Sequence, residues 1–208
     1  MTKNIELLQV LISKLCHDLA GSVSTIYNCV DLIDEDQASI KNQSRLLLSQ
    51  ETKNLVSKIK LYRYVYGYSN NALSITELIE LLKENIPNEK MKIETSVHDS
   101  SSTIDVNIAK ALFCLFTFFH DNPRKNGVIY LSCDRNMNIG LRFSSSVFEF
   151  NLQSLQIITN KNNKEEMTVR NCREFYINTL CERAGYSIII DNDGQNNEIT
   201  IRKNKEDL

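Results

Sequence analysis

The stretch that decides the fold is residues 4–33, NIELLQVLISKLCHDLAGSVSTIYNCVDLI. Nine positions in it follow one another at alternating steps of three and four residues, which is the heptad spacing of a long amphipathic helix. They are Ile5, Leu8, Ile12, Leu15, Leu19, Ser22, Ile26, Cys29 and Ile33. With Ile5 and Ile12 at heptad position a, His17 occupies position f, the one farthest from the packed face. The sequence therefore predicts a long helix that holds His17 toward solvent.

A second long helix is expected after the polar turn DEDQAS (34–39). The run 40–66 places six residues at matching heptad spacing, namely Leu48, Thr52, Leu55, Ile59, Tyr62 and Tyr66. Two long helices with a short connection form an antiparallel hairpin. A single hairpin of this length cannot bury its apolar stripes, so we expect a homodimer in which two hairpins form a four-helix bundle.

The end of this second helix, LYRYVYGYS (61–69), is rich in tyrosine. Such a run is compatible with a base-stacking surface for RNA, but stacking platforms are accompanied by positive charge and the chain carries a net charge of -2. We therefore expect the tyrosines to pack where the hairpin meets the next domain. Gly67 and the following polar residues mark the boundary, which divides the chain into domains 1–69 and 70–208.

Beyond the boundary the pattern becomes that of an α/β domain. Ser74 and Glu77 have the spacing of a capping box and open a short helix that ends before Pro87. The remaining expected elements are a strand at 91–97, an apolar helix at 106–120, a hairpin of strands at 127–133 and 138–144, a less ordered polar stretch near 159–166, a helix at about 168–184 that stops at Gly185, and paired strands at 186–191 and 197–203. The predicted fold class is α+β, with a mixed sheet that carries about three helices on one face.

Composition excludes several classes of function. Lysine and arginine number 24 against 26 acidic residues, so no global charge favours nucleic acid or an anionic membrane. No stretch approaches the roughly 20 apolar residues of a membrane span, and the first helix lacks the apolar region of a signal peptide, so we expect a cytoplasmic protein. The six cysteines form no C-x-x-C pair and are predicted to be buried free thiols.

The surroundings of His17 favour a functional residue over an idle surface histidine. Gly21 lies one turn after His17, where a glycine costs a helix about 1 kcal/mol relative to alanine but leaves the imidazole unobstructed. Ser24 is also small, so a partner's loop could approach this side closely. A metal-dependent phosphohydrolase of the His-Asp type is disfavoured, because His98 and His120 fall at a strand end and a helix end without ligand partners.

Three segments resemble a known family. They are LCHDLAGSVSTIYNCVDLI (15–33), ALFCLFTFFHDNPRKNGVIYL (111–131) and TVRNCREFYINTLCERAGYSI (168–188). A helical hairpin with an exposed His-Asp pair followed by an α/β sandwich looks like the dimerisation and ATP-binding domains of a sensor histidine kinase, and the closer resemblance is to the ChpT-type histidine phosphotransferases of alphaproteobacteria. Ser22 stands where that family has a proline, Cys29 where it has a glycine, and Cys114 where it often has an asparagine.

The resemblance implies a role for each residue near His17. His17 would accept a phosphoryl group on Nε2 from a receiver-domain aspartyl phosphate and pass it to a second receiver, and Asp18 would orient or polarise the ring through Nδ1. The receivers would belong to a hybrid histidine kinase and to response regulators, with Mg²⁺ held by the receiver's own acidic residues. Lys14, Gly21 and Ser24 would lie in the partner-binding surface, although a lysine at heptad position c is more often an ordinary solvated surface charge.

The second domain lacks the features that hold ATP in kinases of this type. The six glycines are dispersed, and none are close enough together to form a phosphate cradle. The helix at 106–120 offers Cys114, Phe116, Phe118 and Phe119 where a nucleotide pocket needs polar groups. We therefore expect no nucleotide, cofactor or metal bound by this chain. Two alternatives remain open, which are a non-catalytic dimeric scaffold for response regulators and an active autophosphorylating kinase.

Overall fold

The computed structural model describes residues 2–33, 37–68, 72–85, 91–99, 102–120, 127–144, 152–159, 166–192 and 197–204. The chain divides into two compact units, Met1–Tyr68 and Ser69–Leu208.

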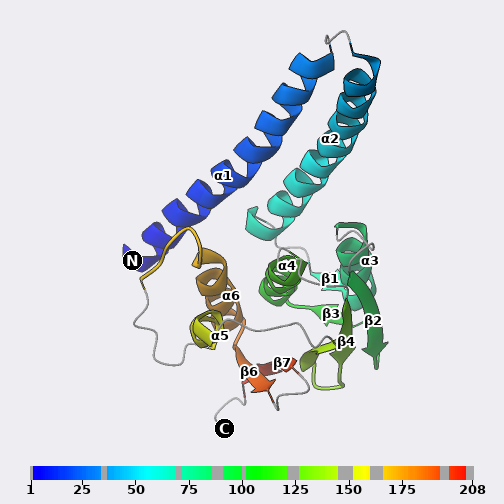
Figure 1. Cartoon of the computed structure of the whole chain (residues 1–208). Helices are drawn as coiled ribbons and strands as arrows, with labels where there is room; N and C mark the ends of the chain where they lie inside the picture. Colours follow the sequence, from blue (N-terminus) through cyan, green and yellow to red (C-terminus); the bar gives the residue numbers. More distant parts are fainter. Residues whose placement is uncertain are drawn as a thin grey trace. The chain divides into compact units, whose positions relative to one another are not determined.

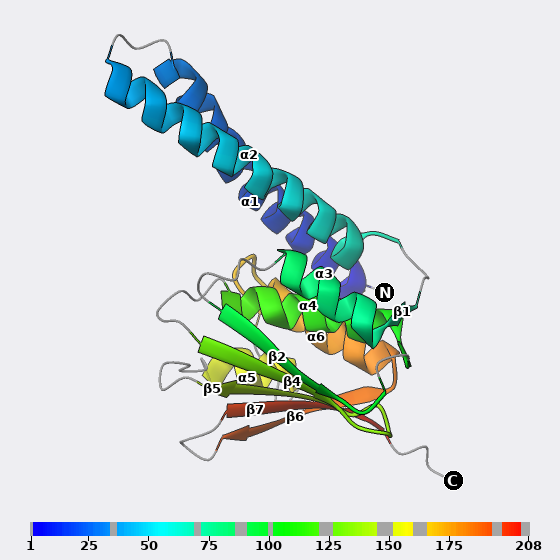
Figure 2. The ribbon, with the colours of Figure 1, turned by 90° about the vertical axis from the view of Figure 1, so that its right-hand side faces the viewer.

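The first unit is a hairpin of two long helices, α1 (Thr2–Ile33) and α2 (Ala38–Tyr66), which lie side by side and run in opposite directions (Figures 1 and 2). The two helices predicted from the heptad spacing are thus confirmed. Helix α2 begins earlier than expected, because Ala38 and Ser39 belong to its first turn rather than to the connection, while Asp34–Asp36 lie outside the described residues. It ends at Gly67, whose N–H donates to the Arg63 carbonyl at 3.1 Å.

The seam predicted for α1 is correct in its second half and wrong in its first. Ser22 and Cys29 are buried as predicted, and in the N-terminal half Leu7 and Leu11 are buried. The predicted seam residues Ile5, Leu8 and Ile12 remain about half exposed, at 55%, 56% and 49%. The cause is that the N-terminal half of α1 carries apolar side chains on two neighbouring faces, and spacing alone does not tell which of the two is buried.

The second unit contains a five-stranded mixed sheet in the order β2-β4-β5-β7-β6. Its strands are β2 (Met91–Val97), β4 (Gly127–Cys133), β5 (Ile139–Ser144), β6 (Tyr186–Asn192) and β7 (Asn197–Lys203). Strands β2 and β4 pair in parallel, and the other neighbours pair antiparallel. Helices α3 (Ile75–Asn85), α4 (Val106–His120) and α6 (Cys172–Arg183) lie on one face of this sheet (Figure 2). The predicted α+β fold class is confirmed.

Three details of the second unit differ from the sequence prediction. A seven-residue helix, α5 (Leu152–Ile158), precedes the stretch expected to be less ordered, of which residues 160–165 lie outside the described part of the chain. Helix α6 begins at Cys172, four residues later than the predicted start at 168. A small antiparallel pair, β1 (Leu73–Ser74) with β3 (Thr103–Ile104), was not predicted, because two residues are too short to show an alternating pattern.

The core of the second unit is centred on helix α4. Its side chains from Ile108 to Phe116 are almost completely buried, since the helix is apolar on nearly every side and packs among other elements. Leu78 and Leu82 from α3 and Ile129 and Leu141 from the sheet complete the packing. Five of the six free cysteines are buried as predicted, whereas Cys16 on α1 is exposed, which corrects the expectation for that residue.

Two local signals were interpreted correctly from the sequence. The Ser74 N–H donates to Glu77 Oε2 at 2.8 Å and the Glu77 N–H donates to Ser74 Oγ at 3.2 Å, so the capping box that opens α3 is formed in both directions. Gly185 follows α6 with a φ of 73°, a left-handed conformation that glycine adopts at little cost. The capping box marks the start of α3, and the left-handed Gly185 marks the end of α6.

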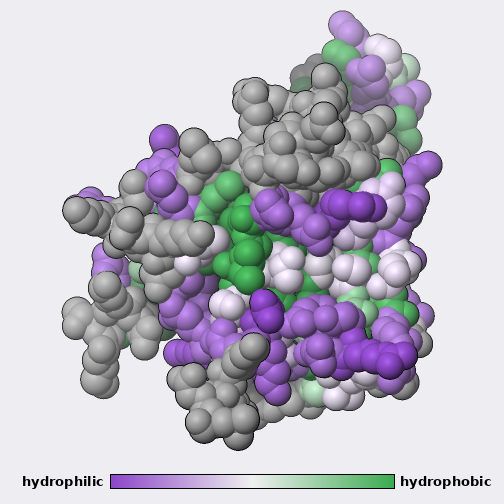
Figure 3. Space-filling model, turned by 90° about the horizontal axis from the view of Figure 1, so that it is seen from below, coloured by the Kyte–Doolittle hydropathy of each residue, from purple (hydrophilic) through white to green (hydrophobic). Residues whose placement is uncertain are grey.

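Among the residues that the structure describes, no helix lies over the other face of the sheet (Figure 2). In the view from below it carries mostly hydrophilic and neutral side chains, coloured purple and white, with some apolar surface between them (Figure 3). This is the usual pattern of a sheet that has helices on one face only.

Candidate functional site

His17 lies on α1 with its side chain in solvent. The imidazole has a relative exposure of 84%, which agrees with the prediction that heptad position f points away from the packed face. Gly21 and Ser24, on the same side of the helix, are also exposed. Apart from the two neighbouring residues and the backbone of the same helix, no heavy atom lies within 4 Å of the position that a Cβ on Gly21 would take. The space beside the imidazole is therefore open within this chain.

Asp18 connects His17 to its neighbours. Its Oδ1 lies 3.4 Å from His17 Nδ1, while its Oδ2 lies 3.1 Å from Lys14 Nζ and accepts a hydrogen bond from the Tyr62 hydroxyl at 3.2 Å. The side chains of Lys14 and Asp18 are mostly covered, at 21% and 23% exposure. Lys14 is therefore paired within the chain rather than fully solvated, and the Asp18 carboxylate has partners on both helices of the hairpin.

These partners keep Asp18 ionised. Partial burial raises the pKa of the Asp18 carboxyl, but the charge and hydrogen bond of Lys14, together with hydrogen bonds from His17 and Tyr62, outweigh burial and leave the pKa below its ordinary value of 3.8. An ionised carboxylate next to Nδ1 favours a proton on that nitrogen. The Nε2 nitrogen, on the far side of the ring, then carries the lone pair.

Helix α1 presents three separate faces. One is buried and includes Leu7, Leu11 and Cys29. A second is apolar but exposed, with Ile5, Leu8, Ile12, Val23 and Val30 at 49–56% exposure. At 3.6 residues per turn, the direction of His17 differs by roughly 115° from the first face and by roughly 140° from the second. His17 thus lies on a third face, which we call the histidine face.

Ser22 departs from the proline of the resembling family, and the structure gives it a specific contact. Ser22 is only 3% exposed, and its Oγ accepts a hydrogen bond from Lys58 Nζ on α2 at 2.9 Å. Helix α1 is continuous through this position. The serine hydroxyl therefore makes a cross-helix hydrogen bond that a proline could not make.

Sequence reasoning missed Tyr62 and Lys58. It assigned the tyrosines to the domain boundary, whereas Tyr62 bonds to Asp18 across the hairpin. Which residues of two antiparallel helices meet depends on the register of the hairpin, which the turn determines. Long side chains also lean toward the N-terminus of their own helix, so contacting residues need not be level along the helix axes. One signal in the sequence could have indicated these contacts. Lys58 and Tyr62 are four residues apart, as are their partners Asp18 and Ser22.

The positions at which an ATP-type site would need polar groups lie partly in the core of the second unit. Cys114 and Phe116 are buried in the core at 1% and 0% exposure, whereas the side chains of Phe118, Phe119 and His120 lie outside the described residues. In the part of the chain that the structure describes, no group of three His, Cys, Asp or Glu side chains is arranged to hold a metal ion. His98 accepts a hydrogen bond at Nε2 from Arg135 Nε at 2.6 Å.

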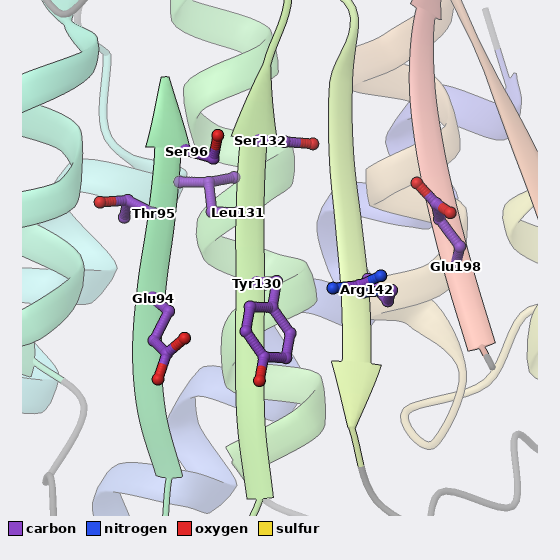
Figure 4. A pocket seen from close by; sticks show the side chains of 8 residues that line it. All are labelled: Glu94, Thr95, Ser96, Tyr130, Leu131, Ser132, Arg142 and Glu198. Atoms are coloured by element: carbon purple, nitrogen blue, oxygen red, sulfur yellow. The ribbon is translucent and has the colours of Figure 1, made fainter. Parts of the chain in front are cut away.

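A shallow hollow of about 390 Å³ lies on the open face of the sheet (Figure 4). Glu94, Tyr130, Arg142 and Glu198 come from four adjacent strands and are cross-strand neighbours of one another. The Arg142 guanidinium lies 4.9 Å from the centre of the Tyr130 ring, a cation–π contact. The absence of a side chain at Gly140 leaves room for the neighbouring Ser132 side chain, because a Cβ on residue 140 would lie only 2.6 Å from Ser132 Oγ. The hollow holds two carboxylates and one guanidinium, a mixed charge that favours no single ligand class.

Comparison with known proteins gives a match in structure only. No protein-family model matches the chain, and no curated protein matches its sequence. A bacterial phosphotransferase solved at 1.7 Å is similar with a TM-score of 0.82 over 95% of this chain and 96% of the other, at 17% identity. The histidine kinase AdeS of Acinetobacter baumannii aligns with a TM-score of 0.49 at 12% identity, over 94% of this chain and 98% of the other. The first comparison shows a shared fold.

The helices were also compared with the length of a membrane span. Among the residues that are described, no helix is both long and apolar enough to cross a bilayer.

Proposed function

We propose that this chain is a histidine phosphotransferase of a two-component phosphorelay, with His17 as the phosphoacceptor. The observation that carries the proposal is an imidazole at 84% exposure whose Nδ1 faces an ionised carboxylate. The shared fold with a bacterial phosphotransferase, together with the His-Asp motif, supports the same role. Relay between receiver domains also assigns the protein to the cytoplasm.

The chemical step follows from the neutral ring with its proton on Nδ1. The Nε2 lone pair attacks the phosphorus of a receiver aspartyl phosphate, the N–P bond forms, and the P–O bond breaks to release the aspartate carboxylate. The ring keeps its Nδ1 proton and becomes cationic, and Asp18 stabilises that charge from 3.4 Å. Attack by a second receiver's aspartate on the phosphohistidine reverses these bond changes. The chain needs no further proton donor for either direction.

The receiver is expected to bind the histidine face around Lys14, His17, Asp18, Gly21 and Ser24. Gly21 offers open space beside the imidazole for a receiver loop. Mg²⁺ would come with the receiver, held by that domain's acidic residues, and would neutralise the phosphoryl oxygens during transfer. Lys14 pairs with Asp18 at 3.1 Å and lies one turn before His17 on the same helix.

The exposed apolar face of α1 is the basis for a proposed homodimer. Its five aliphatic residues are half exposed in a single chain, and pairing with a second hairpin into a four-helix bundle would remove them from water. Burial of apolar area is worth about 25 cal/mol per Å², so a stripe of this length is a substantial driving force. The histidine face would remain accessible in such a dimer because the two faces point in different directions.

We further propose that the second unit does not bind ATP. The core positions Cys114 and Phe116 of α4 are fully packed and apolar, and they offer no ligand for a metal-nucleotide complex. Calorimetry with Mg-ATP should show no saturable binding up to about millimolar concentration, which corresponds to roughly 4 kcal/mol. Saturable binding with a lower dissociation constant would support the autokinase alternative.

The decisive test is transfer of ³²P from a phosphorylated receiver domain. Wild type should take acid-labile label from the receiver and none from ATP. His17→Ala should fold normally, because an exposed side chain contributes little to packing, but should take no label. His98→Ala is the matched control, since His98 is also exposed, and it should label like wild type. If wild type binds receivers without taking label, the chain is a scaffold and the phosphotransfer proposal is wrong.

A further inference from the structure

The Tyr62 hydroxyl is the link between the second helix and the reactive pair. It comes from a residue 44 positions away in the chain and donates to Asp18 Oδ2 at 3.2 Å. Lys14, the other partner of this oxygen, is on α1 itself, as are Asp18 and His17. The lysine can therefore follow the carboxylate through several rotamers, whereas Tyr62 approaches from a separate element.

Tyr62 is also held more rigidly than Lys14. Its ring contacts the Tyr66 ring with centroids 5.8 Å apart and planes tilted by 58°. A tyrosine has two side-chain torsions before its hydroxyl, whereas a lysine has four, so the hydroxyl position costs less entropy to fix. A donor fixed on Oδ2 leaves Oδ1 directed to His17 Nδ1, an oxygen that Lys14 Nζ also approaches at 3.5 Å.

The orientation of Asp18 decides which ring nitrogen reacts. The Nδ1 to Oδ1 distance of 3.4 Å is longer than an ideal N–H···O hydrogen bond, so a small rotation of the carboxylate would lose the contact. Without it, the ring is free to carry its proton on Nε2, and that tautomer has no lone pair for attack on phosphorus from the solvent side. The angle of the carboxylate thus controls the fraction of His17 that is ready to react.

From this geometry we propose that Tyr62 is a positioning residue for phosphotransfer: its hydroxyl orients Asp18 so that His17 is protonated on Nδ1 and presents a free Nε2. The inference rests on the proposed phosphotransfer function for its consequence, but the tautomer itself is a property of the free protein. Tyr62 does not contact the phosphoryl group in this scheme. It acts through Asp18.

The first readout is the ¹⁵N spectrum of the His17 ring in full-length protein at about pH 8.5, where imidazoles are neutral. Wild type should show predominantly the Nδ1–H form, and Tyr62→Phe should shift the population toward Nε2–H. Tyr27→Phe is the matched control: Tyr27 is on α1 at 65% exposure and should leave the tautomer unchanged. Equal tautomer populations in Tyr62→Phe and wild type would overturn the proposal.

The second readout is single-turnover transfer from a phosphorylated receiver. Tyr62→Phe should lower the transfer rate constant about tenfold, which corresponds to about 1.4 kcal/mol, with the receiver concentration for half-maximal rate unchanged. In an Asp18→Asn background the same change should alter the rate by less than about twofold, because there is no carboxylate left to orient. An equal loss in both backgrounds would mean that Tyr62 acts by packing alone and would refute the positioning role.

The two readouts fail separately. If wild type takes no phosphoryl group but the tautomer shift occurs, the phosphotransfer function is wrong and the orientation of Asp18 by Tyr62 stands. If wild type transfers phosphate and the tautomer does not respond to Tyr62→Phe, the positioning role is wrong and the function stands.

Discussion

Substitution of Gly21 should raise stability, and a bulky side chain at this position should also lower transfer. Gly21 is in the middle of α1, and a Cβ added there would meet nothing within 4 Å. Alanine is about 1 kcal/mol more favourable than glycine inside a helix, and no steric term opposes that gain here. The Thr25 hydroxyl bond to the Gly21 carbonyl, at 3.1 Å, involves the backbone and is retained. Gly21→Ala should therefore stabilise the protein by about 1 kcal/mol.

Urea unfolding followed by helical circular dichroism measures the gain, and receiver transfer measures the loss. Gly21→Arg keeps most of the helix-propensity gain but fills the space beside the imidazole, so transfer and receiver binding should fall together. Gly185→Ala is the contrasting control: its Cβ would also meet open space, but its φ of 73° is left-handed, so it should destabilise by about 1–2 kcal/mol. A loss of stability in Gly21→Ala would refute the exposed placement, and an unchanged transfer rate in Gly21→Arg would refute the docking face.

Three further outcomes are expected. The Ser74 hydrogen bonds lower the pKa of Glu77 below 4.5, so their contribution to stability is present above pH 4.5 and is lost as the pH falls through the lowered pKa. The difference in unfolding free energy between wild type and Glu77→Gln should therefore shrink between about pH 6 and about pH 3, as measured by urea titrations. Leu112→Ala, at 0% exposure, should cost about 2–5 kcal/mol by the same method, and a cost below about 1 kcal/mol would contradict its place in the core. Ile12→Lys should leave the hairpin folded but give a monomer in sedimentation velocity, whereas a dimer would exclude the exposed apolar face as the interface.

The sequence predicts most of the fold because its long elements carry strong patterns. The apolar run of α4 and the alternation in β2 each extend over several residues, so their type is clear. Helix α5 has only seven residues, too few for helical periodicity to separate it from a strand or a loop. Long patterned segments are therefore predictable, and short ones depend on tertiary contacts.

The site divides in the same way between local and cross-helix contacts. Lys14 and Asp18 pair at four-residue spacing on one helix, and His17 directly precedes Asp18, so these contacts can be read from α1 alone. Tyr62 and Lys58 reach them from α2, and those contacts depend on a register that no spacing within α1 encodes. The split of the α1 seam has a similar origin, because a helix with two adjacent apolar faces can pack either one inward.

The three faces of α1 give the chain a modular surface. Packing with α2, the exposed apolar residues and the histidine face occupy different sectors of one helix, separated by roughly a third of a turn. If the proposed docking face is right, a substitution at the exposed Ser24 changes the receiver-binding surface without altering the buried residues Ser22 and Cys29. The residues that would select a partner are thus separate from those buried on this helix.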